Sequence, residues 1–132
     1  MKSLIVEDDF VARRILKDIL SAYGHCDIAI DGQEAVCAFR MAWEENRPYD
    51  LVCMDIMMPN IDGHEALRQI RELEDLLCIT NSRKVKAIML SALDDPKNVV
   101  RAFAKGEVSS YLVKPIKKQD LVAAISKLGL LA

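Results

Sequence analysis

The chain has 132 residues, of which 52% are hydrophobic and 5% aromatic, and 18 basic against 20 acidic side chains give a net charge of −2. This length fits a single domain, residues 1–132, with no room for an effector domain, and the hydrophobic content excludes wholesale disorder. The near-neutral charge argues against a nucleic-acid-binding module. No apolar run reaches the roughly 18 residues of a membrane helix, and the acidic start is unlike a signal peptide. We therefore expect a cytoplasmic protein that binds neither nucleic acid nor membrane.

The four cysteines are widely spaced and form no Cys-x-x-Cys pair: Cys26, Cys37, Cys53 and Cys78. Three of them stand in apolar stretches. This pattern predicts buried thiols in a reducing compartment and argues against a disulfide framework or a zinc site.

Short apolar runs alternate with helical patterns five times along the chain. Residues 4–6 are the first run, and the helix after it has an apolar face that extends from Val11 to Tyr23. Residues 25–30 alternate between apolar and polar, as expected of a half-exposed edge strand. A second helix carries apolar residues from Ala35 to Trp43. Residues 51–54 are continuously apolar, which is typical of a strand covered on both faces.

The second half of the chain repeats this alternation. A loop over residues 57–63 precedes a third helix, which is followed by an irregular connection, residues 77–84, that is longer than we expect. Residues 87–90 predict the fourth strand, and a fourth helix starts near Pro96 because proline is favoured in a first turn. Residues 111–113 predict the fifth strand, and the last helix carries Leu121 and Ile125. Five such repeats predict an α/β fold, a doubly wound, flavodoxin-like parallel sheet of five strands with five helices. The alternating second strand favours the order 2-1-3-4-5.

Ligands of such a sheet bind beyond the carboxyl ends of its strands. The polar residues expected there are Glu7, Asp8 and Asp9 after the first strand, Asp55 after the third, Ser91 after the fourth and Lys114 after the fifth. Carboxylates that converge in one cleft repel each other and need a cation, and hard oxygen ligands with room for water suit Mg²⁺. A lysine and a serine opposite them could donate to the oxygens of a phosphoryl group. An aspartate beside that metal could act as the nucleophile.

These residues stand in motifs that resemble a known family. Glu7-Asp8-Asp9, the segment from Met54 to Gly63, Leu90-Ser91-Ala92 and the segment from Tyr111 to Pro115 resemble the receiver domains of two-component response regulators, most of all the stand-alone, chemotaxis-type members. The resemblance covers essentially the whole chain. Asp55 in Asp-x-x-Met-Pro-x-x-x-Gly with Lys114-Pro115 downstream is specific as a combination, although each motif alone is weak evidence for the family.

The resemblance implies a role for each motif residue. Asp55 would accept the phosphoryl group in a Mg²⁺-dependent reaction, and Asp8, Asp9 and the backbone carbonyl of Met57 would complete the metal site, Asp9 more directly than Asp8. Ser91 would hydrogen-bond the phosphoryl group and Lys114 would pair with it. Such a domain would catalyse only its own phosphorylation and dephosphorylation.

The resemblance also implies a switch and partners. Tyr111 and Ser91 would change position on phosphorylation, the donor would be a sensor histidine kinase or a phosphotransfer protein, and a target protein would dock on the fourth helix, fifth strand and fifth helix. His25 and His64 have no partners at ligand spacing, so we expect both at the surface.

Two other functions stay open. One is a receiver-like binding module that works without phosphorylation, against which the complete acidic set argues. The other is a phosphohydrolase with an aspartyl nucleophile, although such enzymes usually carry Asp-x-Asp after the first strand where this chain has Asp8-Asp9.

Overall fold

A computed structural model describes residues 1–58, 60–91 and 108–131. Its elements are β1 (Ser3–Val6), α1 (Phe10–Leu20), β2 (Cys26–Ala29), α2 (Gly32–Glu44), β3 (Leu51–Asp55), α3 (Gly63–Leu76), the 3-10 helix η1 (Asn81–Arg83), β4 (Lys86–Ser91), β5 (Ser110–Val113) and α5 (Lys118–Lys127). The predicted fourth helix, near Pro96, lies outside the described residues. None of the helices described is long and apolar enough to cross a membrane.

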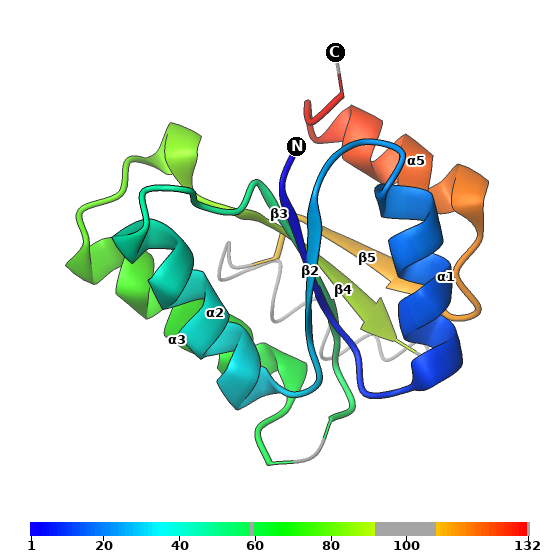
Figure 1. Cartoon of the computed structure of the whole chain (residues 1–132), viewed down its shortest axis with the longest axis horizontal. Helices are drawn as coiled ribbons and strands as arrows, with labels where there is room; N and C mark the ends of the chain where they lie inside the picture. Colours follow the sequence, from blue (N-terminus) through cyan, green and yellow to red (C-terminus); the bar gives the residue numbers. More distant parts are fainter. Residues whose placement is uncertain (59, 92–107, 132) are drawn as a thin grey trace.

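The five strands form one parallel sheet in the order β2-β1-β3-β4-β5, so the predicted fold class and strand order are confirmed. Strands β1 and β3 are completely buried, as their continuous apolar sequences predict, whereas β2 is partly exposed at an edge. In Figure 1, α2 and α3 lie over one face of the sheet, and α1 and α5 lie over the other.

Three aspartates begin the helices that follow β1, β2 and β3. Asp9, Asp31 and Asp62 are N-caps whose carboxylates accept from the backbone N–H three residues on, at 2.8, 2.8 and 2.9 Å. Each carboxylate satisfies a helix N–H that has no partner within the helix. These caps fix where the helices start beside the carboxyl ends of the strands.

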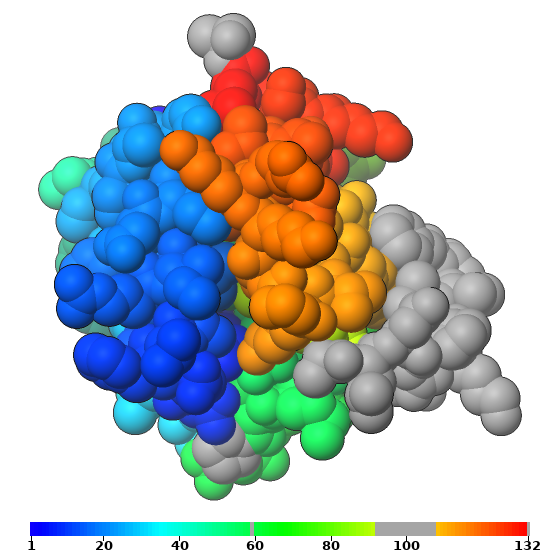
Figure 2. All heavy atoms as spheres, turned by 90° about the vertical axis from the view of Figure 1, so that its right-hand side faces the viewer, coloured from blue at the N-terminus to red at the C-terminus, as the bar shows by residue number. Residues whose placement is uncertain are grey.

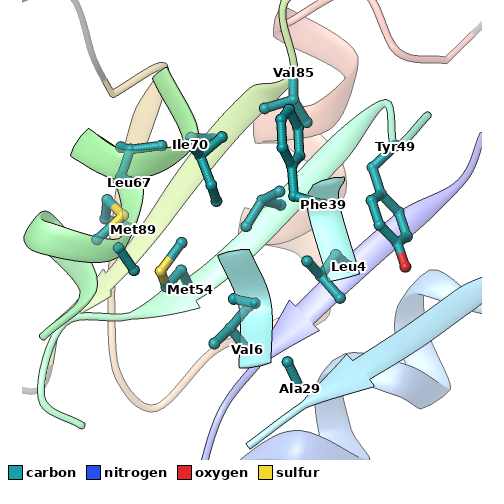
Figure 3. Packing of buried hydrophobic residues seen from close by; sticks show 14 of the residues in the cluster. Leu4, Val6, Ala29, Phe39, Tyr49, Met54, Leu67, Ile70, Val85 and Met89 are labelled. Carbon is teal, nitrogen blue, oxygen red and sulfur yellow. The ribbon is translucent and has the colours of Figure 1, made fainter. Parts of the chain in front are cut away.

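The core has two parts, one on each face of the sheet. Figure 3 shows the part under α2 and α3, where Phe39 and Ile70 from the helices pack on Leu4, Met54 and Met89 of the strands. The other part lies under α1 and α5, the blue and orange helices that are neighbours in Figure 2. Aliphatic and methionine side chains therefore dominate both parts, as the low aromatic content predicts.

The predicted faces are partly wrong at the level of single residues. On α1, Val11 and Ile15 are exposed although the periodicity placed them with the buried Leu16. Cys53 is buried as predicted, but Cys37 and Cys78 are exposed, and none of the four thiols is in a disulfide. Val11, Ile15 and Cys37 thus lie on the solvent-facing sides of their helices, although their neighbours along the chain are largely apolar.

Candidate phosphoacceptor site

Three carboxylates converge where β1 and β3 end. The strand register pairs Val6 with Met54, so the next residues, Glu7 and Asp55, are neighbours across the two strands. Glu7, Asp8 and Asp55 each offer an oxygen within 4.8 Å of the others. Glu7 is completely buried and Asp55 is 5% exposed, whereas Asp8 faces solvent.

This cluster differs in one member from the predicted set. The predicted metal ligands are Asp8, Asp9, Asp55 and the carbonyl of Met57. Among the carboxylates, the structure brings Glu7 into one group with Asp8 and Asp55. The Asp9 carboxylate instead accepts from the backbone N–H of Ala12 as the N-cap of α1. The parallel pairing of β1 with β3 places Glu7 beside Asp55, because each directly follows the paired residues Val6 and Met54.

Lys114 joins the buried carboxylates from the other side. Its Nζ lies 3.0 Å from both carboxylate oxygens of Glu7 and 3.2 Å from Oδ2 of Asp55. The lysine side chain is 21% exposed. The peptide bond between Lys114 and Pro115 is cis. Because its Nζ contacts both side chains, the ammonium of Lys114 bridges two carboxylates that would otherwise repel each other.

The electrostatics of this bridge follow from burial and charge. Burial raises the pKa of Glu7 above its usual value, the hydrogen bond from Lys114 opposes this, and the charge of Asp55 adds to it. Burial alone would lower the pKa of Lys114, but the bonds to Glu7 and Asp55 outweigh it and raise that pKa. The ammonium is thus held in its charged form beside Asp55.

The Asp55 carboxylate has a fixed direction. Its Oδ1 accepts from the backbone N–H of Met57 at 3.2 Å, and its Oδ2 faces Lys114. The start of α3 lies directly behind it, because a Cβ added at Gly63 would collide with the carbonyl oxygen of Asp55. Glycine at position 63 therefore allows the helix to approach the site. The side chain of Met57 is 75% exposed.

Ser91 and Lys114 lie at the ends of neighbouring strands. Ser91, the last residue of β4, pairs in register with Val113, and its carbonyl accepts from the backbone N–H of Lys114 at 2.7 Å. Asp55 pairs with Leu90, the residue before Ser91. All of the predicted positions from β3, β4 and β5 thus meet at one edge of the sheet.

Tyr111 lies on β5, three residues before Lys114. It is half-buried on β5, and its hydroxyl oxygen is 3.4 Å from Nε2 of His64 at the start of α3, with ring centroids 6.2 Å apart. His64, which was expected at the surface, is only partly exposed, and its contact with Tyr111 was not predicted. His25 is exposed as predicted, and its Nε2 lies 2.7 Å from Oδ1 of Asp27.

Converging carboxylates, a bridging lysine and a strand-end serine can hold a divalent cation and receive an anion such as a phosphoryl group. Known proteins are similar to this chain in sequence and in fold. VanRB of Enterococcus faecalis, a regulatory protein, is 33% identical over 125 residues, which are 95% of this chain and 50% of VanRB. The chain spans about half the length, or less, of the first curated relatives that it matches.

Two solved structures are similar over nearly the whole chain. CheY of Borrelia burgdorferi, in a complex with CheX, BeF3 and Mg²⁺, has a TM-score of 0.83 and 27% identity, and covers 99% of this chain and 90% of its own. The receiver domain of Ssk1 of Saccharomyces cerevisiae, in a complex with the histidine phosphotransfer protein Ypd1, has a TM-score of 0.80 and 29% identity, and covers 98% and 88%. Residues 3–126 match the response regulator receiver domain family. The chain therefore belongs to the response regulator receiver domains of two-component signalling.

Proposed function

We propose that Asp55 accepts a phosphoryl group from a histidine kinase or a phosphotransfer protein in a Mg²⁺-dependent reaction. The observation that carries the proposal is the bridge from Lys114 to Glu7 and Asp55. Asp55 is 5% exposed, yet its carboxylate is held by one ammonium and one backbone N–H. Burying a carboxylate costs free energy unless it is paired with a cation or hydrogen-bonded. Proteins keep clusters of buried ionisable groups mostly at functional sites.

The donor set fits Mg²⁺. Glu7, Asp8 and Asp55 offer carboxylate oxygens within 4.8 Å of one another, and hard oxygen ligands are those that Mg²⁺ takes. We propose Asp8, Asp55 and the carbonyl of Met57 as its ligands. Asp9, expected at the metal from the family resemblance, would act indirectly by capping α1 and so holding Asp8. When bound, Mg²⁺ offsets negative charge on the phosphoryl oxygens.

The chemical step uses few groups of the chain. A carboxylate oxygen of Asp55 attacks the phosphorus of a phosphohistidine, the P–O bond forms and the P–N bond breaks. The electron pair of that bond stays on the imidazole nitrogen of the donor, which takes a proton from solvent. Lys114 and the hydroxyl of Ser91 donate hydrogen bonds to the phosphoryl oxygens as charge moves onto Asp55.

The phosphoryl group on Asp55, which carries a charge of about −1.5 to −2, then biases a two-state element. We propose that this element includes Ser91 and the ring of Tyr111, and that a target protein docks on the predicted fourth helix, β5 and α5. Two solved relatives were crystallised with protein partners, CheY with CheX and Ssk1 with the histidine phosphotransfer protein Ypd1, which supports a partner protein and, more specifically, a phosphotransfer partner. Such partners and the reduced thiols are consistent with a cytoplasmic protein.

Mass spectrometry of the intact protein tests this proposal. The protein is mixed with Mg²⁺ and a small phosphodonor, beside the variant Asp55→Asn and a control without Mg²⁺. We expect one phosphoryl adduct that is lost in base, absent in the variant and absent after chelation. No adduct at any donor concentration would support a phosphorylation-independent binding module, and continuous hydrolysis of a phosphoester would support a phosphohydrolase.

A further inference from the structure

A cavity of about 490 Å³ lies where the carboxyl ends of α2 and α3 meet the long connection over residues 77–84. Its lining includes Trp43 from α2, Leu73 and Leu77 from the end of α3, and Ile79 and Arg83 from the connection. This connection precedes β4, so the cavity lies at the edge where strands begin, opposite to the edge that carries Asp55 (Figure 1). We call this cavity and its rim the α2–α3 groove.

The wall of the α2–α3 groove is held in place by buried and charged groups. The completely buried carboxylate of Glu74 accepts from the backbone N–H of Val85 at 2.7 Å, and its carbonyl accepts from the backbone N–H of Ile79 at 2.9 Å. Lys84 adds an ion pair to Asp75 at 3.0 Å. A surface that is formed in advance loses little conformational entropy when it binds.

Apolar surface is left open at this rim. Leu77 is 48% exposed, and the adjacent Leu76 is 74% exposed. Trp43, the single tryptophan of the chain, lines the groove and is partly exposed to solvent. Large apolar and aromatic side chains beside a preformed hollow are typical anchors for a partner.

The charge of the α2–α3 groove selects among partners. The guanidinium of Arg83 lies 5.1 Å from the centroid of the Trp43 ring, and no carboxylate of residues 1–58, 60–91 or 108–131 forms an ion pair with it. The other cation, Arg40, is 3.9 Å from Glu44, and both are more than half exposed, so that pair is weak. A guanidinium in such a cation–π contact can still donate its N–H groups to a carboxylate. The groove thus complements an acidic group next to an apolar one.

We propose that the α2–α3 groove docks a peptide segment of a partner protein in which an acidic side chain neighbours a large apolar one. The apolar side chain lies in the cavity beside Trp43 and Leu77, and the carboxylate pairs with Arg83. Because the groove lies at the edge opposite to Asp55, this docking does not require phosphorylation. It gives the domain an anchoring surface separate from the one through which the phosphoryl signal is read.

The test starts with selection of a displayed random-peptide library on the full chain, with counter-selection on Leu77→Ala to remove peptides that bind away from the groove. The recovered peptides should carry Asp or Glu beside Leu, Ile or Phe. A synthetic copy of the most frequent peptide, titrated into the protein, should change the Trp43 fluorescence with saturation. Arg83→Glu and the milder Arg83→Gln should weaken binding at least roughly tenfold, the loss of one charge-assisted contact.

The controls make this test decisive. Arg14→Glu, which makes the same charge change on α1, and Asp55→Asn should both bind the peptide as the unchanged protein does, and all variants are compared by thermal unfolding. Recovered peptides without acidic residues, equal binding by Arg83→Glu, or binding lost in Asp55→Asn would each overturn the proposal. A dimer in sedimentation that Leu77→Asp abolishes would overturn it too, because the occupant would then be a second copy of the chain.

Discussion

Replacing Lys114 with methionine removes the cation that bridges Glu7 and Asp55 and keeps a side chain of similar length. In the structure its Nζ contacts both oxygens of Glu7 at 3.0 Å and Asp55 at 3.2 Å. Glu7 is completely buried and Lys114 is 21% exposed, so Lys114→Met takes the ammonium away from two close, desolvated carboxylates.

The size of the effect follows from this geometry. Removing one partner of a buried ion pair costs 3–5 kcal/mol, and the partial exposure of Lys114 favours the lower end, about 3 kcal/mol. For a domain of this size the melting temperature should fall by roughly 9–15 °C. Lys118→Met, which removes an exposed lysine at the start of α5, should change stability by less than about 0.5 kcal/mol.

The pH dependence has a definite sign. Burial raises the pKa of Glu7, and the hydrogen bond from Lys114 opposes that rise, so losing Lys114 should raise the pKa of Glu7 further. A carboxyl group whose pKa is raised on folding favours the folded state at low pH, and this contribution is lost as the pH rises through that pKa. With a chelator present, the stability deficit of Lys114→Met should therefore shrink as the pH falls from about 7 toward 5.

Urea unfolding followed by Trp43 fluorescence measures these differences. Mg²⁺ should stabilise Lys114→Met more than the unchanged protein. A cation that binds the folded state and not the unfolded state adds stability by mass action, and in the variant it also replaces the missing positive charge. Equal unfolding midpoints of Lys114→Met and Lys118→Met at pH 7, or a deficit that grows toward pH 5, would refute this reasoning.

Three further predictions concern other parts of the chain. Glu74→Ala should lower the free energy of unfolding by about 3 kcal/mol, because it leaves the backbone N–H of Val85 without its acceptor and removes the ion pair with Arg71. The exposed Glu72→Ala should cost under about 1 kcal/mol in the same urea titration. Met57→Asn should shorten the half-life of the phosphorylated protein by roughly tenfold, since a polar side chain at the mouth of the site can orient water; an unchanged half-life in a mass time course would count against this. Tyr49→Phe removes the 2.6 Å hydrogen bond from the Tyr49 hydroxyl to the Asp27 carboxylate; burial raises the pKa of Asp27, but this bond helps to keep that pKa below its usual value. Stability at pH 7 should therefore fall by about 1 kcal/mol, and the difference from the unchanged protein should vanish as the pH falls through the pKa of Asp27. An undiminished difference in acid would exclude the bond as its cause.

The order of the strands could be predicted because the chain alternates apolar runs with amphipathic helices, and only a few right-handed parallel topologies are compatible with that pattern. The half-polar second run predicted the edge position of β2, and the structure confirms it. The positions of Asp55, Ser91 and Lys114 at one edge follow from the same alternation, since each comes at the end of a strand.

What could not be predicted depends on single-residue register and on contacts across the fold. Three consecutive acidic residues follow β1, and only the pairing of Val6 with Met54 decides that Glu7 lies beside Asp55 while Asp9 caps a helix. The contact between His64 and Tyr111 joins residues 47 positions apart, and no local pattern encodes it. Helix rotation decides that Cys37 faces solvent, and its apolar neighbours along the chain give no sign of it.

Locating the phosphoryl group tests the central claim most directly. The protein is phosphorylated with a small donor and Mg²⁺, treated with borohydride, which reduces an aspartyl phosphate to homoserine, and mapped by peptide mass spectrometry. We predict homoserine at position 55 and nowhere else, with the yield lost when Mg²⁺ is chelated. Homoserine at position 8 or 9, or a phosphoryl adduct that leaves residue 55 unreduced, would contradict the assignment of Asp55 as the phosphoacceptor.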